Sequence, residues 1–133
     1  MSKVVLVTGA SSGIGRRTAI VLNDAGYKVY AVARRVERMD DLRQSGIAVL
    51  SMDVTDEKSM TSVVGQIVAR EGSIDILINN AGYGLYGAIE EVPLDDARRQ
   101  MEVNLFGMAG MVRLVLPAMR KKGWGRIVNV SSI

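Results

Sequence analysis

The stretch Thr8-Gly9-Ala10-Ser11-Ser12-Gly13-Ile14-Gly15 decides the fold, because it joins a short apolar run to a helical pattern through three glycines. Residues 4–7 read Val-Val-Leu-Val, which predicts a buried strand. After the glycines, apolar and small residues recur at helical spacing, and Gly26 supplies a left-handed end. The predicted inner face of this helix consists of Ile14, Thr18, Val21, Leu22 and Ala25.

The rest of the chain alternates β-branched runs with helical patterns, which is typical of a parallel sheet covered on both faces. A helix capped by Thr55 is predicted between the third and fourth strands, and it ends at Gly72. A long helix over residues 94–122 follows Pro93 and ends at Gly123. Further strands are predicted at residues 29–32, 48–52, 74–78 and 127–130. The predicted inner stripe of the long helix is Met101, Leu105, Met108, Val112, Val115 and Met119.

Composition excludes several kinds of chemistry. The 133 residues contain no cysteine and no histidine, so disulfides, thiolate catalysis and a typical metal centre are not expected. The net charge is +3, but the basic residues are scattered in three pairs, one triplet and single positions, and we predict no nucleic-acid partner. No uninterrupted apolar run reaches the roughly 20 residues of a membrane span, so no membrane partner is predicted. Residues 1–3 lead straight into a strand without a secretory leader, which favours a cytoplasmic location.

The glycine turn has the features of a dinucleotide-binding loop. A pyrophosphate needs backbone N–H donors at close range and the positive end of a helix. Gly9 allows the tight turn, Gly13 the close approach of the ligand, and Gly15 the packing of helix on strand. Ser11 and Ser12 add hydroxyl donors, and Ile14 lies in the same turn. A plain tight turn between strand and helix remains the alternative.

The end of the second strand indicates which dinucleotide is bound. An acid there would hydrogen-bond the free ribose 2′-hydroxyl of NAD and repel the 2′-phosphate of NADP. Residues 31–35 read Ala-Val-Ala-Arg-Arg, with no acid, and Arg34 offers a planar fork suited to phosphate. NADP is therefore predicted over NAD. The alternative is that Arg34 and Arg35 are solvated loop residues.

Three motifs in order resemble the short-chain dehydrogenase/reductase family: residues 8–15, Asn79-Asn80-Ala81-Gly82 and Asn129-Val130-Ser131-Ser132. Residues 83–91 and 102–107 resemble the hydroxysteroid-dehydrogenase-like branch. The resemblance covers the chain from residue 4 to its end. It implies a Rossmann-type doubly wound parallel α/β sheet, with residues 1–133 as one NAD(P)-binding domain. It also implies an NADP(H)-dependent oxidoreductase that interconverts a carbonyl and an alcohol by hydride transfer.

The resemblance also implies roles for individual residues. Asp53 and Val54 would contact the adenine, and Asn104 would position a proton-relay water. Ser132 would hydrogen-bond the oxygen of the substrate. Asn80, Ala81 and Gly82 would brace the sheet and line the cofactor cleft.

Structural alternatives stay open for these residues. Asp53 could cap a turn before Thr55, and Asn79 and Asn80 could be ordinary turn residues. The spacing of Asn104 places its amide on the apolar face of the long helix, where burial without partners is costly. Asn104 could be a satisfied structural residue, and Ser132 an ordinary strand-end serine.

The family's acid is a tyrosine in a Tyr-x-x-x-Lys helix after the serine, and the sequence stops before such a pair. We therefore predict a sheet truncated after its fifth strand and a 133-residue chain that is inactive alone. A homo-oligomer is predicted, with Gly107 and Gly110 allowing close approach between subunits. Alternatives for the parent protein are a non-catalytic NADP sensor or partner-binding module, and a methyltransferase using S-adenosylmethionine, which the basic second-strand end disfavours.

Overall fold

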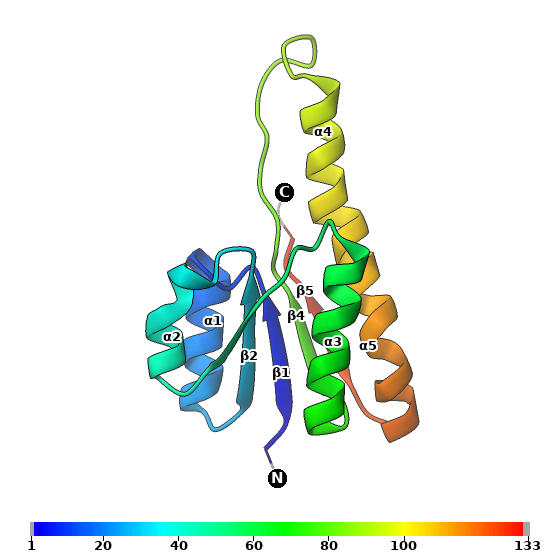
Figure 1. Cartoon of the computed structure of the whole chain (residues 1–133). Helices are drawn as coiled ribbons and strands as arrows, with labels where there is room; N and C mark the ends of the chain where they lie inside the picture. The colour runs from blue at the N-terminus through cyan, green and yellow to red at the C-terminus, as the bar shows by residue number, and fades with distance from the viewer. Residues whose placement is uncertain (1, 132–133) are drawn as a thin grey trace.

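A computed structural model describes residues 2–131, which form a five-stranded, wholly parallel sheet with helices on both faces (Figure 1). This confirms the predicted α/β class. The strand order is β3-β2-β1-β4-β5, so the order reverses at β1, and the carboxyl ends of β1 and its two neighbours meet at one edge. The strands are β1 Val4–Thr8, β2 Lys28–Ala33, β3 Ala48–Ser51, β4 Ile76–Asn79 and β5 Arg126–Asn129.

The helices divide between the two faces of the sheet. Figure 1 shows α1 and α2 on one side, α3 and α5 on the other, and α4 standing beyond the carboxyl edge. The short helical segments η1 and α2 after β2 were not predicted from the sequence. The helical elements are α1 Gly13–Asp24, η1 Val36–Met39, α2 Asp40–Gln44, α3 Glu57–Glu71, α4 Leu94–Met101, the π-helical segment η2 Glu102–Gly107 and α5 Met108–Lys122.

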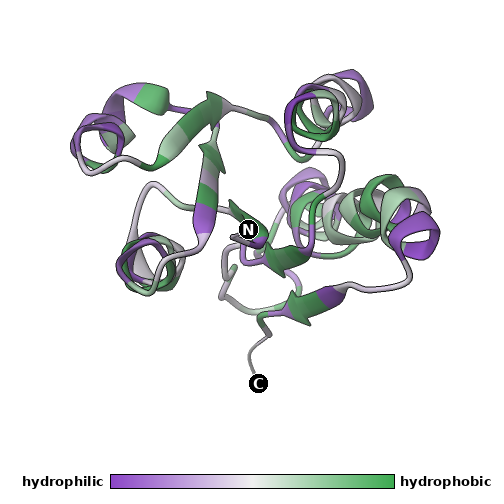
Figure 2. Cartoon of the chain, turned by 90° about the horizontal axis from the view of Figure 1, so that it is seen from below, coloured by the Kyte–Doolittle hydropathy of each residue, from purple (hydrophilic) through white to green (hydrophobic). Residues whose placement is uncertain are grey.

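Alternate residues of β1 belong to two separate hydrophobic cores, one on each face of the sheet. Leu6 is buried against residues of α3 and α5, including Ile67 and Met111. Val5 and Val7 are buried on the opposite face, where Met39 and Leu42 belong to the same cluster. Figure 2 shows the mostly hydrophobic strands lying between helices of mixed character. Burial of β1 on both faces explains its uninterrupted apolar sequence.

Helix α1 packs on the sheet through a face that shares Leu22 with the predicted one but leaves Ile14 and Val21 exposed. Ile14 is 66% exposed and Val21 48% exposed, whereas Gly15 and Ala19 are buried. The helix begins against the glycine turn, where a Cβ on Gly15 would overlap the backbone of Gly9. Because this close approach fixes the helix, its small residues face the sheet.

Helix α3 begins with a cap one residue later than predicted. The Asp56 carboxylate accepts a hydrogen bond from the backbone N–H of Lys58 at 3.0 Å. The hydroxyl of Thr55, the predicted cap, instead donates to Asp53 Oδ1 at 2.7 Å. An aspartate at this position satisfies an N–H of the first turn and complements the helix dipole. The predicted end at Gly72 is confirmed.

The predicted long helix starts and ends at the expected residues but is neither uniform nor fully packed. Its centre winds as the π segment η2, and Met101 and Leu105 of the predicted inner stripe are 47% and 42% exposed. Only the α5 half lies beside the sheet, where Val115 and Met119 are buried. By length and composition alone the run 94–122 could cross a membrane, a criterion that packed core helices also meet.

Gly107 and Gly110 serve packing within the chain. A Cβ on Gly107 would lie 2.8 Å from the Val54 carbonyl oxygen. A Cβ on Gly110 would lie 3.0 Å from Cε of Met60 in α3. Within the chain, both glycines therefore allow close approach to α3 and to the loop that precedes it.

Candidate cofactor-binding and active site

A cavity of about 920 Å³ opens at the carboxyl edge of the sheet, where β1 meets its neighbours. Its volume lies within the range of about 300–1,000 Å³ that is usual for small-molecule and cofactor sites. Every predicted cofactor residue except Gly15 lines it. These lining residues are Gly9, Ser11, Ser12, Gly13, Ile14, Arg34, Asp53, Val54, Asn80, Ala81 and Gly82.

The glycine turn presents the amino end of α1 to this cavity. Gly9 and Gly13 adopt φ values of +61° and +56°, a region that side chains with a Cβ rarely enter. Ser12 occupies the N-cap position without making a side-chain capping bond. The first backbone N–H groups of a helix have no partners within it, so these groups are available to an anion. Gly15 lies behind the turn and allows the packing instead.

Thr8 ties the glycine turn to the end of β4. Its buried hydroxyl oxygen accepts hydrogen bonds from the backbone N–H groups of Asn80 and Ala81, both at 3.0 Å. The Asn80 side chain donates in turn to the Gly9 carbonyl at 3.2 Å. Asn80 is therefore more than a turn residue, because it fixes one wall of the cavity relative to the other. The sequence pattern indicated no separate role for Thr8 beyond its place in the turn.

The amide of Asn79 connects β4 to two other elements. Its Nδ2 lies 3.0 Å from Asn129 Oδ1 in β5 and 3.4 Å from the Met108 carbonyl oxygen at the start of α5. Asn79 is 5% exposed, so these bonds satisfy an amide that water scarcely reaches. The second and third predicted motifs, residues 79–82 and 129–132, thus meet in space. Ser132, the predicted substrate-binding serine, lies outside the described residues.

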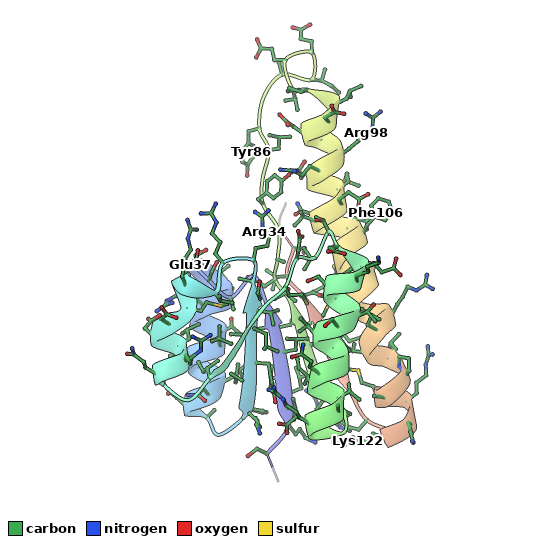
Figure 3. All side chains as sticks on the ribbon, in the orientation of Figure 1. Arg34, Glu37, Tyr86, Arg98, Phe106 and Lys122 are labelled. Atoms are coloured by element: carbon green, nitrogen blue, oxygen red, sulfur yellow. The ribbon has the colours of Figure 1, made fainter. Side chains whose placement is uncertain are left out.

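Arginines follow β2 at one end of the cavity. Arg34 lies at the carboxyl edge, below the loop that precedes α4 (Figure 3). Arg35 and Arg38 line the same cavity, and η1 brings Arg38 there by turning the chain back one helical turn after the strand. Arg38 was not predicted as a site residue, because no pattern in the sequence indicated a helical turn at residues 36–39.

Asp53 caps the turn before Thr55 and also lines the cavity. Its Oδ1 accepts hydrogen bonds from the Thr55 backbone N–H at 2.9 Å and from the Thr55 hydroxyl, and its side chain also lines the cavity. Partial burial raises the pKa of Asp53. The hydrogen bonds from Thr55 and the charges of Arg34 and Arg99 outweigh that effect, so the net pKa is lowered and the group is ionised at neutral pH.

Asn104 holds a loop and does not line the cavity. Its Oδ1 accepts from the Tyr83 backbone N–H at 3.0 Å, and its Nδ2 donates to the Tyr83 carbonyl at 2.8 Å. The residue is exposed, so the predicted burial of its amide is wrong; at η2 the helix has already left the cover of the sheet. A Cβ on Gly82 would lie 2.8 Å from Asn104 Oδ1. Asn104 therefore packs directly behind Gly82, which does line the cavity.

The family model for short chain dehydrogenases matches residues 3–133. The chain belongs to this family. A short-chain dehydrogenase from Streptomyces avermitilis is 43% identical and superposes with a TM-score of 0.96, covering 99% of this chain and 50% of that one. The 3-ketodihydrosphingosine reductase of Bacteroides thetaiotaomicron is 42% identical over 98% of this chain and 47% of its own.

A solved serine dehydrogenase in complex with NADP⁺ is also similar to this short chain dehydrogenase. It is 32% identical, with a TM-score of 0.92, over 97% of this chain and 54% of that chain. The chain spans about half the length of the curated relatives it matches. These relatives confirm the predicted family and the Rossmann-like fold. The predicted homo-oligomer, cytoplasmic location and absence of nucleic-acid and membrane partners stay predictions.

Proposed function

We propose that this chain is the cofactor-binding part of an NADP(H)-dependent oxidoreductase that interconverts a carbonyl and an alcohol by hydride transfer. The observation that carries the proposal is the lining of one cavity by the amino end of α1 and by the arginines that follow β2. The former suits a pyrophosphate and the latter a ribose 2′-phosphate. No acid lies at the end of β2 to favour the free ribose hydroxyl of NAD.

The residues present fit such a cofactor. The backbone N–H groups of residues 11–14 would hold the pyrophosphate, and Arg34 the 2′-phosphate. Asp53 and Val54 would border the adenine, and the wall of residues 80–82, braced by Thr8, would position the nicotinamide half. When bound, the cofactor supplies or accepts the hydride.

Residues 1–133 do not contain the proton donor that the family uses, so we assign proton transfer to a longer, whole protein. None of the four tyrosines in the sequence is followed by lysine at the fourth position, which is the pair that the family uses. Tyr83 and Tyr86 follow β4, and Tyr83 lines the cavity, where it would form a wall of the substrate site. We expect residues 1–133 to bind NADPH but not to reduce ketones alone.

The test is a calorimetric titration with NADPH, NADH and S-adenosylmethionine. We expect NADPH to bind at least about tenfold more tightly than NADH, and S-adenosylmethionine not to bind. Arg34→Ala should weaken NADPH binding by about 10- to 100-fold, the effect of losing a charge-assisted hydrogen bond, and should barely change NADH binding. Arg43→Ala is the matched control, because Arg43 pairs with Asp40 at 3.3 Å outside the cavity. Equal affinity for NADPH and NADH would refute the NADP assignment.

A non-catalytic NADP-binding module is the second candidate. The same cavity favours it, since nothing in the binding residues requires turnover. Oxidation of NADPH by the full-length protein in the presence of a ketone separates the two. Tight NADPH binding without any such oxidation would favour the sensor.

A further inference from the structure

The wall of the cavity opposite β2 is formed by α4 and η2. Arg99 and Val103 line the cavity from this side. They are four residues apart, so their side chains lie on the same face of the helix. Gln100 Nε2 and Asn104 Nδ2 both donate to the Tyr83 carbonyl, at 3.3 Å and 2.8 Å. These bonds fix the rotation of the helix, so Arg99 is held toward the cavity.

The neighbouring arginine faces elsewhere. Arg98 pairs with Asp95 at 3.3 Å on the outer side of α4, where Figure 3 shows it pointing away from the carboxyl edge of the sheet. It does not line the cavity. Two adjacent residues of the same type therefore occupy different environments on a single helix.

Arg99 and Arg34 line the cavity from different elements, and the charge of each lowers the pKa of the same carboxylate. Both act on Asp53, and together with the bonds from Thr55 they keep it ionised. An ionised carboxylate disfavours a phosphate bound nearby, and the positive charges of the two arginines offset that repulsion. The charge distribution at this end of the cavity thus depends on α4 as well as on the residues after β2.

The cavity carries more positive charge than a pyrophosphate alone requires. Among the described residues that line it, the arginines are Arg34, Arg35, Arg38 and Arg99, and the only carboxylate is Asp53. The glycine turn already offers backbone N–H groups to a pyrophosphate. The arginines therefore favour a ligand with a further phosphate at the adenosine end.

We propose that Arg99 binds the 2′-phosphate of NADP together with Arg34, so that the cofactor ties α4 to the sheet. This rests on the proposed function. It adds a cofactor-specificity residue from the far wall of the cavity, and it makes the position of α4 depend on which dinucleotide is bound. Since α4 has no buried residue of its own, its attachment to the rest of the fold is weak without that link.

The first experiment measures binding of two fragments that differ only in the 2′-phosphate: adenosine 2′,5′-bisphosphate and adenosine 5′-monophosphate. Arg99→Ala should weaken binding of the bisphosphate by about tenfold or more and change binding of the monophosphate by less than about twofold. Arg98→Ala, the matched control, should leave both affinities unchanged. Arg99 is exposed, so its loss should not alter the urea midpoint.

The second experiment measures amide hydrogen exchange in α4. NADPH should slow exchange at residues 97–101 more than NADH does, and this difference should vanish in Arg99→Ala but persist in Arg98→Ala. If the original chain binds neither dinucleotide, the proposed function is overturned. If it prefers NADPH and Arg99→Ala keeps that preference, only the role of Arg99 is overturned.

Discussion

Replacing Thr8 by valine should loosen the contact that brings β1 and β4 together at the site. Thr8 is 1% exposed, and its Oγ1 is the acceptor for two backbone N–H groups, those of Asn80 and Ala81, at 3.0 Å each. Valine has nearly the same shape, so the change removes the acceptor without opening a cavity. A buried N–H left without a partner costs about 1–3 kcal/mol.

Both N–H groups belong to half-buried residues, which water partly reaches, so the lower end of that range applies to each. We expect Thr8→Val to lower the free energy of unfolding by about 2–3 kcal/mol, a large part of the roughly 5–15 kcal/mol of a typical domain. Thr8→Ser keeps the hydroxyl and should lose only about 1 kcal/mol for the missing methyl.

Urea unfolding followed by circular dichroism measures both variants. The valine variant should have the lower midpoint with an unchanged slope. NADPH affinity should fall with it, because residues 80–82 lose one of their fixed points. If the valine variant unfolds at the same urea concentration as the serine variant, the hydroxyl is not what holds this edge of the sheet.

Two further predictions concern stability. Burial alone would raise the pKa of Asp75. Lys122 and the hydrogen bonds from the Val4 backbone N–H and the Ser73 hydroxyl lower it by more, so the net pKa lies below its ordinary 3.8. The carboxylate thus stabilises the fold above about pH 4, and this contribution is lost as the pH falls toward the folded-state pKa, so acid unfolding should be shallower in Asp75→Asn. Gly9→Ala should cost about 2–4 kcal/mol, from a strained φ and a Cβ placed 2.9 Å from the backbone of Ala81. Gly46→Ala has similar φ strain but open space around the Cβ, and it should cost only about 1–2 kcal/mol in the same urea assay.

Local patterns predicted the strands well because the signals are strong there. The run at residues 4–7 is apolar on both faces, and β1 is buried on both faces. The glycine turn was identified because glycine is needed where φ is positive, as at Gly9 and Gly13. Because the identities of these residues are closely linked to their local conformations, their spacing alone was enough to predict the strand and the turn.

Packing faces were harder to predict, since they depend on what the helix meets. Ile14 and Val21 matched a helical stripe, yet the contact of Gly15 with the glycine turn rotates small residues inward instead. The periodicity of residues 94–122 was real, but nothing in it indicates that Met101 lies beyond the end of the sheet. Hydrophobic spacing predicts that a helix forms, but it does not indicate which elements that helix packs against.

The site was predicted in outline through motifs and missed where residues are brought in by tertiary structure. Arg38 reaches the cavity through an unpredicted turn, and Arg99 from a helix some 60 residues later in the chain. Asn104 was predicted as a buried amide, but it is exposed and hydrogen-bonds the backbone N–H and carbonyl of Tyr83. Such assignments require knowing which segments lie side by side.

The parallel arrangement of the strands separates two tasks along the length of the sheet. All five strands start at one edge, where Asp75 accepts from the Val4 backbone N–H at 2.8 Å and pairs with Lys122 at the end of α5. They finish at the other edge, where the cavity lies. During evolution the loops at the carboxyl edge of the sheet can therefore diverge toward new substrates, while the contacts at the opposite edge keep the domain folded.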